Sequence, residues 1–276
     1  MIAARSSGVR FLTLSMLAIS AAVTALPASA QDVVREDDKP DLQFFVGLGL
    51  QVRPSFPGAD SYDLGPLPVI RVRREGEPLP IRSPDQNTAF RLLGKRDGVS
   101  VGGTFNFQSA RKEKDVGAPV GNVGFTFEPG VFAQGFLSDN LRLRAEVRRG
   151  IGGHNAFVGD VAADYVLRGA DDRFVATIGP RVRLADARYN RRYFGVSPDR
   201  AAATGLPAFD TSAGIYAVGA TAGLLYRFSP RWAGYGYAGY DRLTGDAARS
   251  PITRTYGSRD QYSAGIALTY NFIVKR

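Results

Sequence analysis

The last strand-like stretch of the chain, residues 261–272, limits the possible folds more than any other feature. Alternate residues from Tyr262 to Phe272 are apolar or aromatic, and those between them, from Ser263 to Asn271, are small or weakly polar. This two-residue period over roughly 10 residues predicts a β-strand long enough to cross a bilayer when tilted. Aromatic residues at both ends of the apolar face are typical of an outer-membrane barrel. An edge strand of a soluble sandwich is the alternative.

The beginning of the chain predicts export. Two arginines precede an apolar run over 11–26, and Ala28-Ser29-Ala30 has the form of a signal-peptidase site. No later stretch approaches the roughly 18 consecutive apolar residues of a membrane helix. The chain has no cysteine, so neither a disulfide scaffold nor a lipoprotein anchor is expected. We predict a signal peptide over 1–30, a periplasmic tail over 31–40 and an outer-membrane barrel domain over 41–276.

Alternating polarity recurs along the rest of the chain. The predicted strands are 42–52, 69–74, 79–83, 89–94, 99–108, 123–137, 141–149, 157–168, 173–184, 215–228, 231–243 and 261–272, of which 79–83 is the least regular. They predict an all-β fold: an antiparallel transmembrane β-barrel of about 12 strands, within a range of roughly 10–14.

The connections between the predicted strands alternate in length. Short turns at 138–140, 169–172 and 229–230 alternate with longer connections, including an irregular loop over 186–211 and another over 244–259. Outer-membrane barrels have short turns on the periplasmic side and longer loops outside. With an even strand count, both termini are therefore expected in the periplasm of a Gram-negative cell.

Charged residues recur on the strand faces that should point inward. This lumen charge cluster contains Arg71, Arg73, Arg142, Arg144, Arg148, Arg181, Arg183, Glu128, Glu146, Asp160 and Asp164. Unpaired charges in a confined lumen are costly, so the favoured interpretation is a salt-bridged plug that closes a narrow barrel. The alternative is a basic constriction that selects anions.

Two short motifs carry a resemblance to a known family. The first runs from Pro54 through Gly58 to Asp60 and is followed by Gly65-Pro66-Leu67-Pro68, and the second contains Tyr193-Phe194-Gly195-Val196. Their order resembles the MipA/OmpV outer-membrane family over essentially the whole mature chain. The resemblance implies a scaffold that binds a lytic transglycosylase and a penicillin-binding murein synthase. Other family members are described as osmoregulated porins or adhesins, and no catalytic residues are associated with the family.

The sequence offers little support for enzymatic chemistry. The only histidine, His154, is followed by Asn155 and Ala156, and lacks the H-x-S spacing that outer-membrane lipid hydrolases use to activate a serine. One histidine without cysteine also predicts no metal site, and no cofactor motif is present. We therefore expect a protein that is not an enzyme.

Charge and export together indicate the expected partners. The formal net charge of +9 in an exported chain argues against nucleic acid and favours an anionic surface. The loop over 186–211 combines four arginines with Tyr193 and Phe194, so it either binds lipopolysaccharide phosphates or folds back into the barrel mouth. The expected partners are outer-membrane lipid and lipopolysaccharide, together with a periplasmic murein hydrolase or synthase.

Three functions stay open at this point. The first is an outer-membrane scaffold that docks murein-remodelling enzymes, which the family resemblance implies. The second is a small anion-preferring porin, or a surface receptor or adhesin, for which the inward arginines are the motivation. The third is a soluble periplasmic β-protein that binds an anionic glycan.

Overall fold

The computed structural model describes residues 41–77, 79, 81–95, 98–169, 171 and 173–275, so the predicted signal peptide and tail lie outside the described residues. The strands are β1 (Leu42–Pro54), β2 (Tyr62–Arg74), β3 (Thr88–Gly94), β4 (Ser100–Gln108), β5 (Thr126–Ser138), β6 (Leu141–Arg149), β7 (Ile151–Gly152), β8 (Phe157–Arg168), β9 (Phe174–Ala185), β10 (Gly214–Arg227), β11 (Trp232–Leu243) and β12 (Asp260–Val274). The helices are α1 (Glu113–Val116), α2 (Ala187–Phe194), α3 (Pro198–Thr204), α4 (Gly245–Arg249) and α5 (Pro251–Tyr256).

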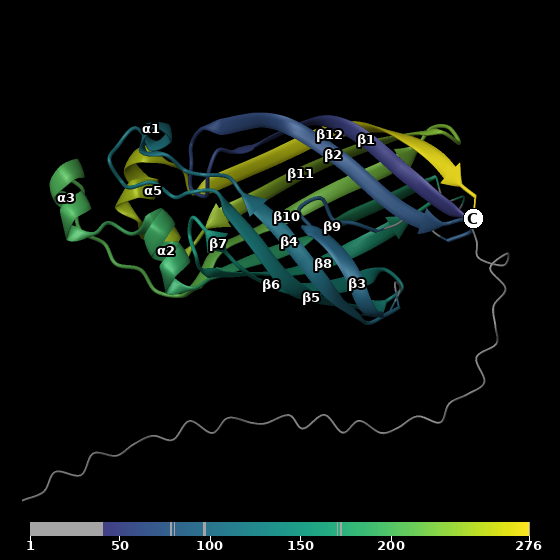
Figure 1. Ribbon diagram of the computed structural model, residues 1–276, viewed down its shortest axis with the longest axis horizontal. Helices are drawn as coiled ribbons and strands as arrows, with labels where there is room; N and C mark the ends of the chain where they lie inside the picture. The colour runs from purple at the N-terminus through teal and green to yellow at the C-terminus, as the bar shows by residue number, and fades with distance from the viewer. Residues whose placement is uncertain are drawn as a thin grey trace, which may run out of the picture. The chain divides into compact units, whose positions relative to one another are not determined.

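The strands form one 12-stranded antiparallel sheet that curls like a barrel (Figure 1). Its order is β2-β1-β12-β11-β10-β9-β8-β6-β5-β4-β3, and the two-residue β7 pairs with β5 off this path. β1 and β12 pair from Leu42 opposite Val274 to Val52 opposite Ala264. We call the end of the barrel with Leu42 and Val274 the terminal end and the other, where the helices gather, the helix end. The predicted all-β antiparallel class is confirmed.

Side chains alternate between the two faces of the wall as the sequence predicts. On β12 the Leu268 side chain is 49% exposed, whereas its neighbour Thr269 is 1% exposed and donates from Oγ1 to the Ala233 carbonyl at 3.0 Å. The same alternation leaves large apolar side chains exposed over the outside of the sheet. So large an apolar outer surface is unfavourable in water, and it matches the hydrocarbon of a membrane. None of the helices in the described part of the chain is long and apolar enough to span a membrane.

Two predictions in this region are wrong: the start of β2 and the strand over 79–83. β2 begins at Tyr62 and includes Pro66 and Pro68, so it starts earlier than the predicted strand over 69–74 and is longer than expected. Proline lacks a backbone N–H and is compatible with a strand whose outer edge has no partner. The described residues at 79–83 form no strand; they lie inside the barrel, where Leu79 and Ser83 are buried. The twelfth strand is therefore β7 and not 79–83.

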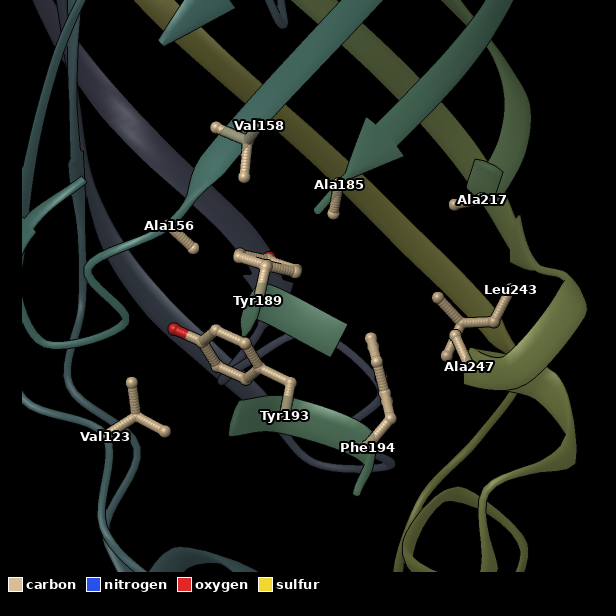
Figure 2. Close-up of a cluster of buried hydrophobic side chains, with 10 residues drawn as sticks. All are labelled: Val123, Ala156, Val158, Ala185, Tyr189, Tyr193, Phe194, Ala217, Leu243 and Ala247. Atoms are coloured by element: carbon tan, nitrogen blue, oxygen red, sulfur yellow. The ribbon is translucent and has the colours of Figure 1, made fainter. Parts of the chain in front are cut away.

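The loop over 186–211 is also more regular than predicted, because it contains α2 and α3. The Asp186 side chain begins α2 by accepting a hydrogen bond from the Tyr189 N–H at 2.8 Å. Tyr189, Tyr193 and Phe194 of α2 are buried against strand ends and α4 (Figure 2). Of the two interpretations of this loop, the structure confirms that its aromatic residues fold back into the barrel mouth.

Candidate functional site

The lumen charge network begins near the middle of the wall, where two arginines bind one aspartate. Arg142 Nη2 lies 2.7 Å from one Asp164 carboxylate oxygen, and Arg181 Nη2 lies 2.8 Å from the other. The Ser83 hydroxyl, on the segment inside the lumen, donates to Asp164 at 2.8 Å. Asp85 on the same segment accepts from Arg181 Nε at 2.7 Å. This segment is therefore attached to the wall through charge-assisted hydrogen bonds, which are stronger than neutral ones.

Arg148 organises the part of the network nearer the helix end. Its Nε lies 2.9 Å from Glu128, and its Nη1 lies 2.6 Å from Asp160 and also contacts Glu146. Arg144 Nη2 lies 2.9 Å from Glu146. Because one guanidinium presents five N–H donors in a fixed plane, Arg148 can hold three carboxylates that otherwise repel one another.

Arg183 joins the two halves of the network. Its nitrogens lie 3.0 Å from Asp160, 2.9 Å from Asp241 and 3.3 Å from Asp85. Guanidinium and carboxylate groups therefore alternate across the lumen from β5 to β11, with the segment before β3 between them. Near Arg142, Arg144 and Arg181 the groups enclose a cavity of about 20 Å³, which is room for about one water molecule.

The structure brings together all of the predicted lumen charge cluster except Arg71 and Arg73. These two point inward as predicted, but they lie nearer the terminal end. The Arg71 guanidinium lies 4.9 Å from the centre of the Tyr235 ring, and Arg73 Nε donates to Gln43 at 2.6 Å. In these contacts the two arginines meet aromatic and amide groups near the terminal end.

Three network residues were not found from the sequence. Ser83 and Asp85 belong to a segment that the sequence does not mark as entering the lumen. Asp241 lies in a predicted strand. Its alternation with Tyr235 and Tyr237 on β11 places all three on the inner face, and this could have predicted it.

His154 lies in the turn between β7 and β8 and does not face solvent. Its ring is fully buried, its Nε2 lies 2.9 Å from Glu128, and its Nδ1 accepts from the Ala156 N–H at 3.2 Å. Since Nδ1 accepts, Nε2 carries the proton and donates to Glu128. The ring also meets Tyr189 edge to face, with centroids 5.1 Å apart. His154 therefore connects the lumen network to α2.

The helix end is closed over this network by the two family motifs. Gly58 donates to Gln261 Oε1 at 3.0 Å and has φ +93°, where a side chain is strained, and a Cβ there would lie 3.2 Å from Phe194. Pro54 ends β1, Asp60 is exposed, and Gly195 donates its N–H to the Arg191 carbonyl at the end of α2. The motifs thus meet through Gly58 and Phe194, although they lie far apart in the sequence.

Arg111 fixes the end of α2. It donates to the Tyr193 carbonyl at 2.8 Å and to the Arg192 carbonyl at 3.0 Å. A cation at these positions is favourable because the last carbonyls of a helix carry partial negative charge. Burial lowers the pKa of Arg111 to about 10 and raises the pKa of Tyr193 above its ordinary value. Arg111 therefore stays charged and Tyr193 neutral at physiological pH.

A larger cavity of about 610 Å³ lies between the charge network and the first family motif. Polar and aromatic side chains from the lumen line it, among them Gln51, Tyr216 and Tyr237. Among the described residues, no group of three or more histidine, cysteine, aspartate or glutamate side chains is arranged to hold a metal ion.

A curled antiparallel sheet with an apolar outer surface and a charged interior defines the class: this is an outer-membrane β-barrel protein. The chain belongs to the family of MltA-interacting protein MipA, whose family model matches residues 46–272. The resemblance stated from the two motifs is therefore confirmed.

Solved structures similar to this chain are outer-membrane barrels of low sequence identity. The KdgM porin is 10% identical, with 84% of this chain and 99% of that chain covered and a TM-score of 0.35. OprG from Pseudomonas aeruginosa is 8% identical, with 85% and 97% covered and a TM-score of 0.25. The CymD monoaromatic hydrocarbon channel is 9% identical, with 86% and 90% covered and a TM-score of 0.34. No curated protein matches the sequence.

Proposed function

We propose that this protein is a closed, non-enzymatic barrel that docks murein-remodelling enzymes, a lytic transglycosylase and a penicillin-binding synthase, at the outer membrane. The observation that carries the proposal is the filled lumen. The segment with Ser83 and Asp85 crosses it, and the cavity between Arg142, Arg144 and Arg181 there has a volume of only about 20 Å³. A hydrated ion needs more room than about one water molecule, so a role that requires no passage fits this barrel best.

The family supplies the class of partner. Its description names an interaction with MltA, and the resemblance implied that this class is a murein hydrolase with its synthase. For this chain the partner is a proposal. We place the terminal end in the periplasm, because its turns at 139–140 and 228–231 are short, as periplasmic turns are in outer-membrane barrels. The enzymes then meet the rim of the terminal end, while the helix end faces outward.

The terminal rim carries exposed arginines that suit an acidic partner surface. Arg74 ends β2, Arg173 precedes β9, and Arg231 precedes β11; all three are exposed. Complementary charge at a rim mainly accelerates and orients association. The helix end offers a matched control, since Arg188, Arg191 and Arg192 on α2 are exposed as well.

A cross-linking pull-down from whole envelopes tests the docking role. We expect murein hydrolase or synthase to co-purify with the wild-type barrel and to be lost with the rim variant R74E/R173E/R231E. The control variant R188E/R191E/R192E reverses the same number of charges and should retain the enzymes. Absence of such enzymes from the wild-type sample, or their equal recovery with both variants, contradicts docking at the terminal rim.

The second candidate function is a small anion-preferring porin, favoured by the arginine-lined cavity of about 610 Å³. Planar bilayer recordings of the purified protein separate the two candidates. We expect silent bilayers from a closed barrel. Frequent anion-selective steps from the wild-type protein would support the porin instead.

A further inference from the structure

The barrel wall has one open side, between β2 and the β3–β4 hairpin. β2 pairs with β1, and β3 pairs with β4, but no backbone pairing joins β2 to β3 among the described residues. In Figure 1 these two strands lie apart as the two free edges of the curled sheet. Unpaired backbone groups facing hydrocarbon are costly, so this opening needs a physical explanation.

The sequence of β2 is adapted to a free edge. The Glu75 N–H donates to the Asp41 carbonyl at 2.8 Å, so odd-numbered residues of β2 bond β1 and even-numbered residues face the opening. Pro66 and Pro68 occupy even positions and remove two N–H donors from that edge. The Pro66 carbonyl accepts from Gln51 Nε2 at 2.9 Å. The motif Gly65-Pro66-Leu67-Pro68 therefore lowers the cost of leaving the wall open there.

The opposite edge of the opening is β4 near the helix end. β3 pairs with β4 only from Ser100 to Phe105, and no described strand pairs with residues 106–108 on this side. Pro68 and Leu67 from one edge, and Phe105 and Phe107 from the other, line the same cavity of about 610 Å³. That cavity therefore reaches from the lumen to the open side of the wall.

Apolar side chains surround the opening on its outer face. Leu64 is 71% exposed and Ile70 is 61% exposed on the β2 edge, and Phe107 is exposed on the β4 edge. In a membrane these residues contact acyl chains. A molecule that occupies both the opening and the cavity thus needs an apolar part outside and a polar part inside.

Two arginines of the cavity indicate the charge of that polar part. Arg53 donates to the Ser109 hydroxyl at 3.4 Å, and Arg82 donates to the Gln86 carbonyl at 3.2 Å. Neither forms an ion pair with a described carboxylate, whereas Arg148 and Arg183 in the same cavity are held by aspartates. Two guanidinium groups that face a cavity with neutral partners favour an anion with several acceptor oxygens.

We propose that this cavity binds an anionic amphiphile, a molecule with an acyl chain and a phosphate or carboxylate head, which enters sideways from the bilayer between β2 and β4. The head lies against Arg53 and Arg82, and the chain lies in the opening beside Pro66 and Pro68. This site is independent of the docking role and needs no passage through the charge network.

Native mass spectrometry of the barrel released from a neutral glycol detergent tests the site with dodecyl phosphate as the probe. We expect one probe molecule bound per wild-type barrel. The variant R53Q/R82Q should weaken binding on the order of a hundredfold, about tenfold for each charge-assisted contact. The control R254Q/R259Q removes two exposed arginines that do not line the cavity and should bind as the wild type does.

Two further probes separate head from chain. Inorganic phosphate carries the head alone and dodecyl maltoside carries the chain with a neutral head, so each should bind far more weakly than dodecyl phosphate. Inorganic phosphate binding as tightly would reveal a lumen anion site without lateral entry and would overturn the proposal. Equal binding of dodecyl phosphate to wild type and R53Q/R82Q would also overturn it, as would no binding to the wild type.

Discussion

Each network arginine is held by more than one acceptor, and this determines what a single substitution does. Arg148 contacts Glu128, Glu146 and Asp160, and all four side chains are largely withdrawn from solvent. Burying a complete ion-pair network contributes little net stability, because desolvation offsets the attraction between charges. Removing one member is different, because the remaining charges stay buried without their partner.

Arg148→Met should therefore destabilise the barrel by about 3–5 kcal/mol. The matched control is Arg149→Met, one residue further along β6, whose guanidinium donates to Asn155 near the surface. Urea unfolding in detergent micelles, followed by the mobility shift between folded and unfolded barrel on gels, measures the difference. Equal midpoints for the two variants would show that the lumen tolerates the three carboxylates alone.

For single residues, the sequence predicts which face of a strand a side chain occupies but not which partner it binds. A two-residue period is enough to place Arg142, Arg144 and Arg148 on one side of β6. Their partners depend on the register with β5 and β8, where Arg142 lies opposite Asp164 and Glu146 opposite Asp160. Register is set by contacts between distant segments, which explains why the ion pairs could not be assigned from the chain alone.

Among the elements, β12 was predicted best, because it is long and its two faces differ strongly. β12 pairs with β1 on one side and with β11 on the other, so it joins the first and last strands of the chain in the sheet. β2 and α2 were predicted less well. β2 contains prolines, which are tolerated because the strand lies at an edge of the sheet. Asp186 begins α2 as its N-cap. Neither the edge position nor the cap can be recognised without the tertiary structure.

Leu268→Arg should cost about 2–4 kcal/mol and block assembly, because it places a charge on the lipid face near the middle of β12. Ser263→Arg is the control, because Ser263 also lies on β12 but lines the lumen cavity of about 610 Å³, so its effect should be far milder. The amount of folded barrel in outer-membrane fractions measures both. Equal damage from the two substitutions is incompatible with the facing of β12.

The lumen segment before β3 makes a second prediction at this scale. Replacing residues 79–86 with a Gly-Ser linker of the same length removes Ser83 and Asp85 from Arg142 and Arg181. Arg142 and Arg181 keep Asp164 but no longer hold a segment across the lumen. The lumen should then be open, so we expect anion-selective steps in planar bilayers where the wild type is silent. A Gly-Ser replacement of α3, none of whose residues is buried, is the control and should stay silent. Conductance unchanged by the lumen replacement would mean that this segment does not close the barrel.

The two ends of the molecule differ in structure. The helix end is closed by packed motifs around Tyr193 and Gly58, and the terminal end has short turns and exposed arginines. The proposed docking role requires the terminal end to face the periplasm. The orientation of the barrel therefore connects the fold to the function and can be measured directly.

Trypsin added to intact cells should cleave, if anywhere, at the helix end. Arg188, Arg191 and Arg192 are exposed there on α2, whereas Arg173 and Arg231 are exposed at the terminal end. With the periplasmic orientation, the second pair becomes accessible only after the outer membrane is permeabilised, and mass spectrometry of the fragments identifies the cut sites. Cleavage after Arg173 or Arg231 on intact cells would invert the topology. It would also put the basic terminal rim on the cell surface, where no periplasmic enzyme could dock.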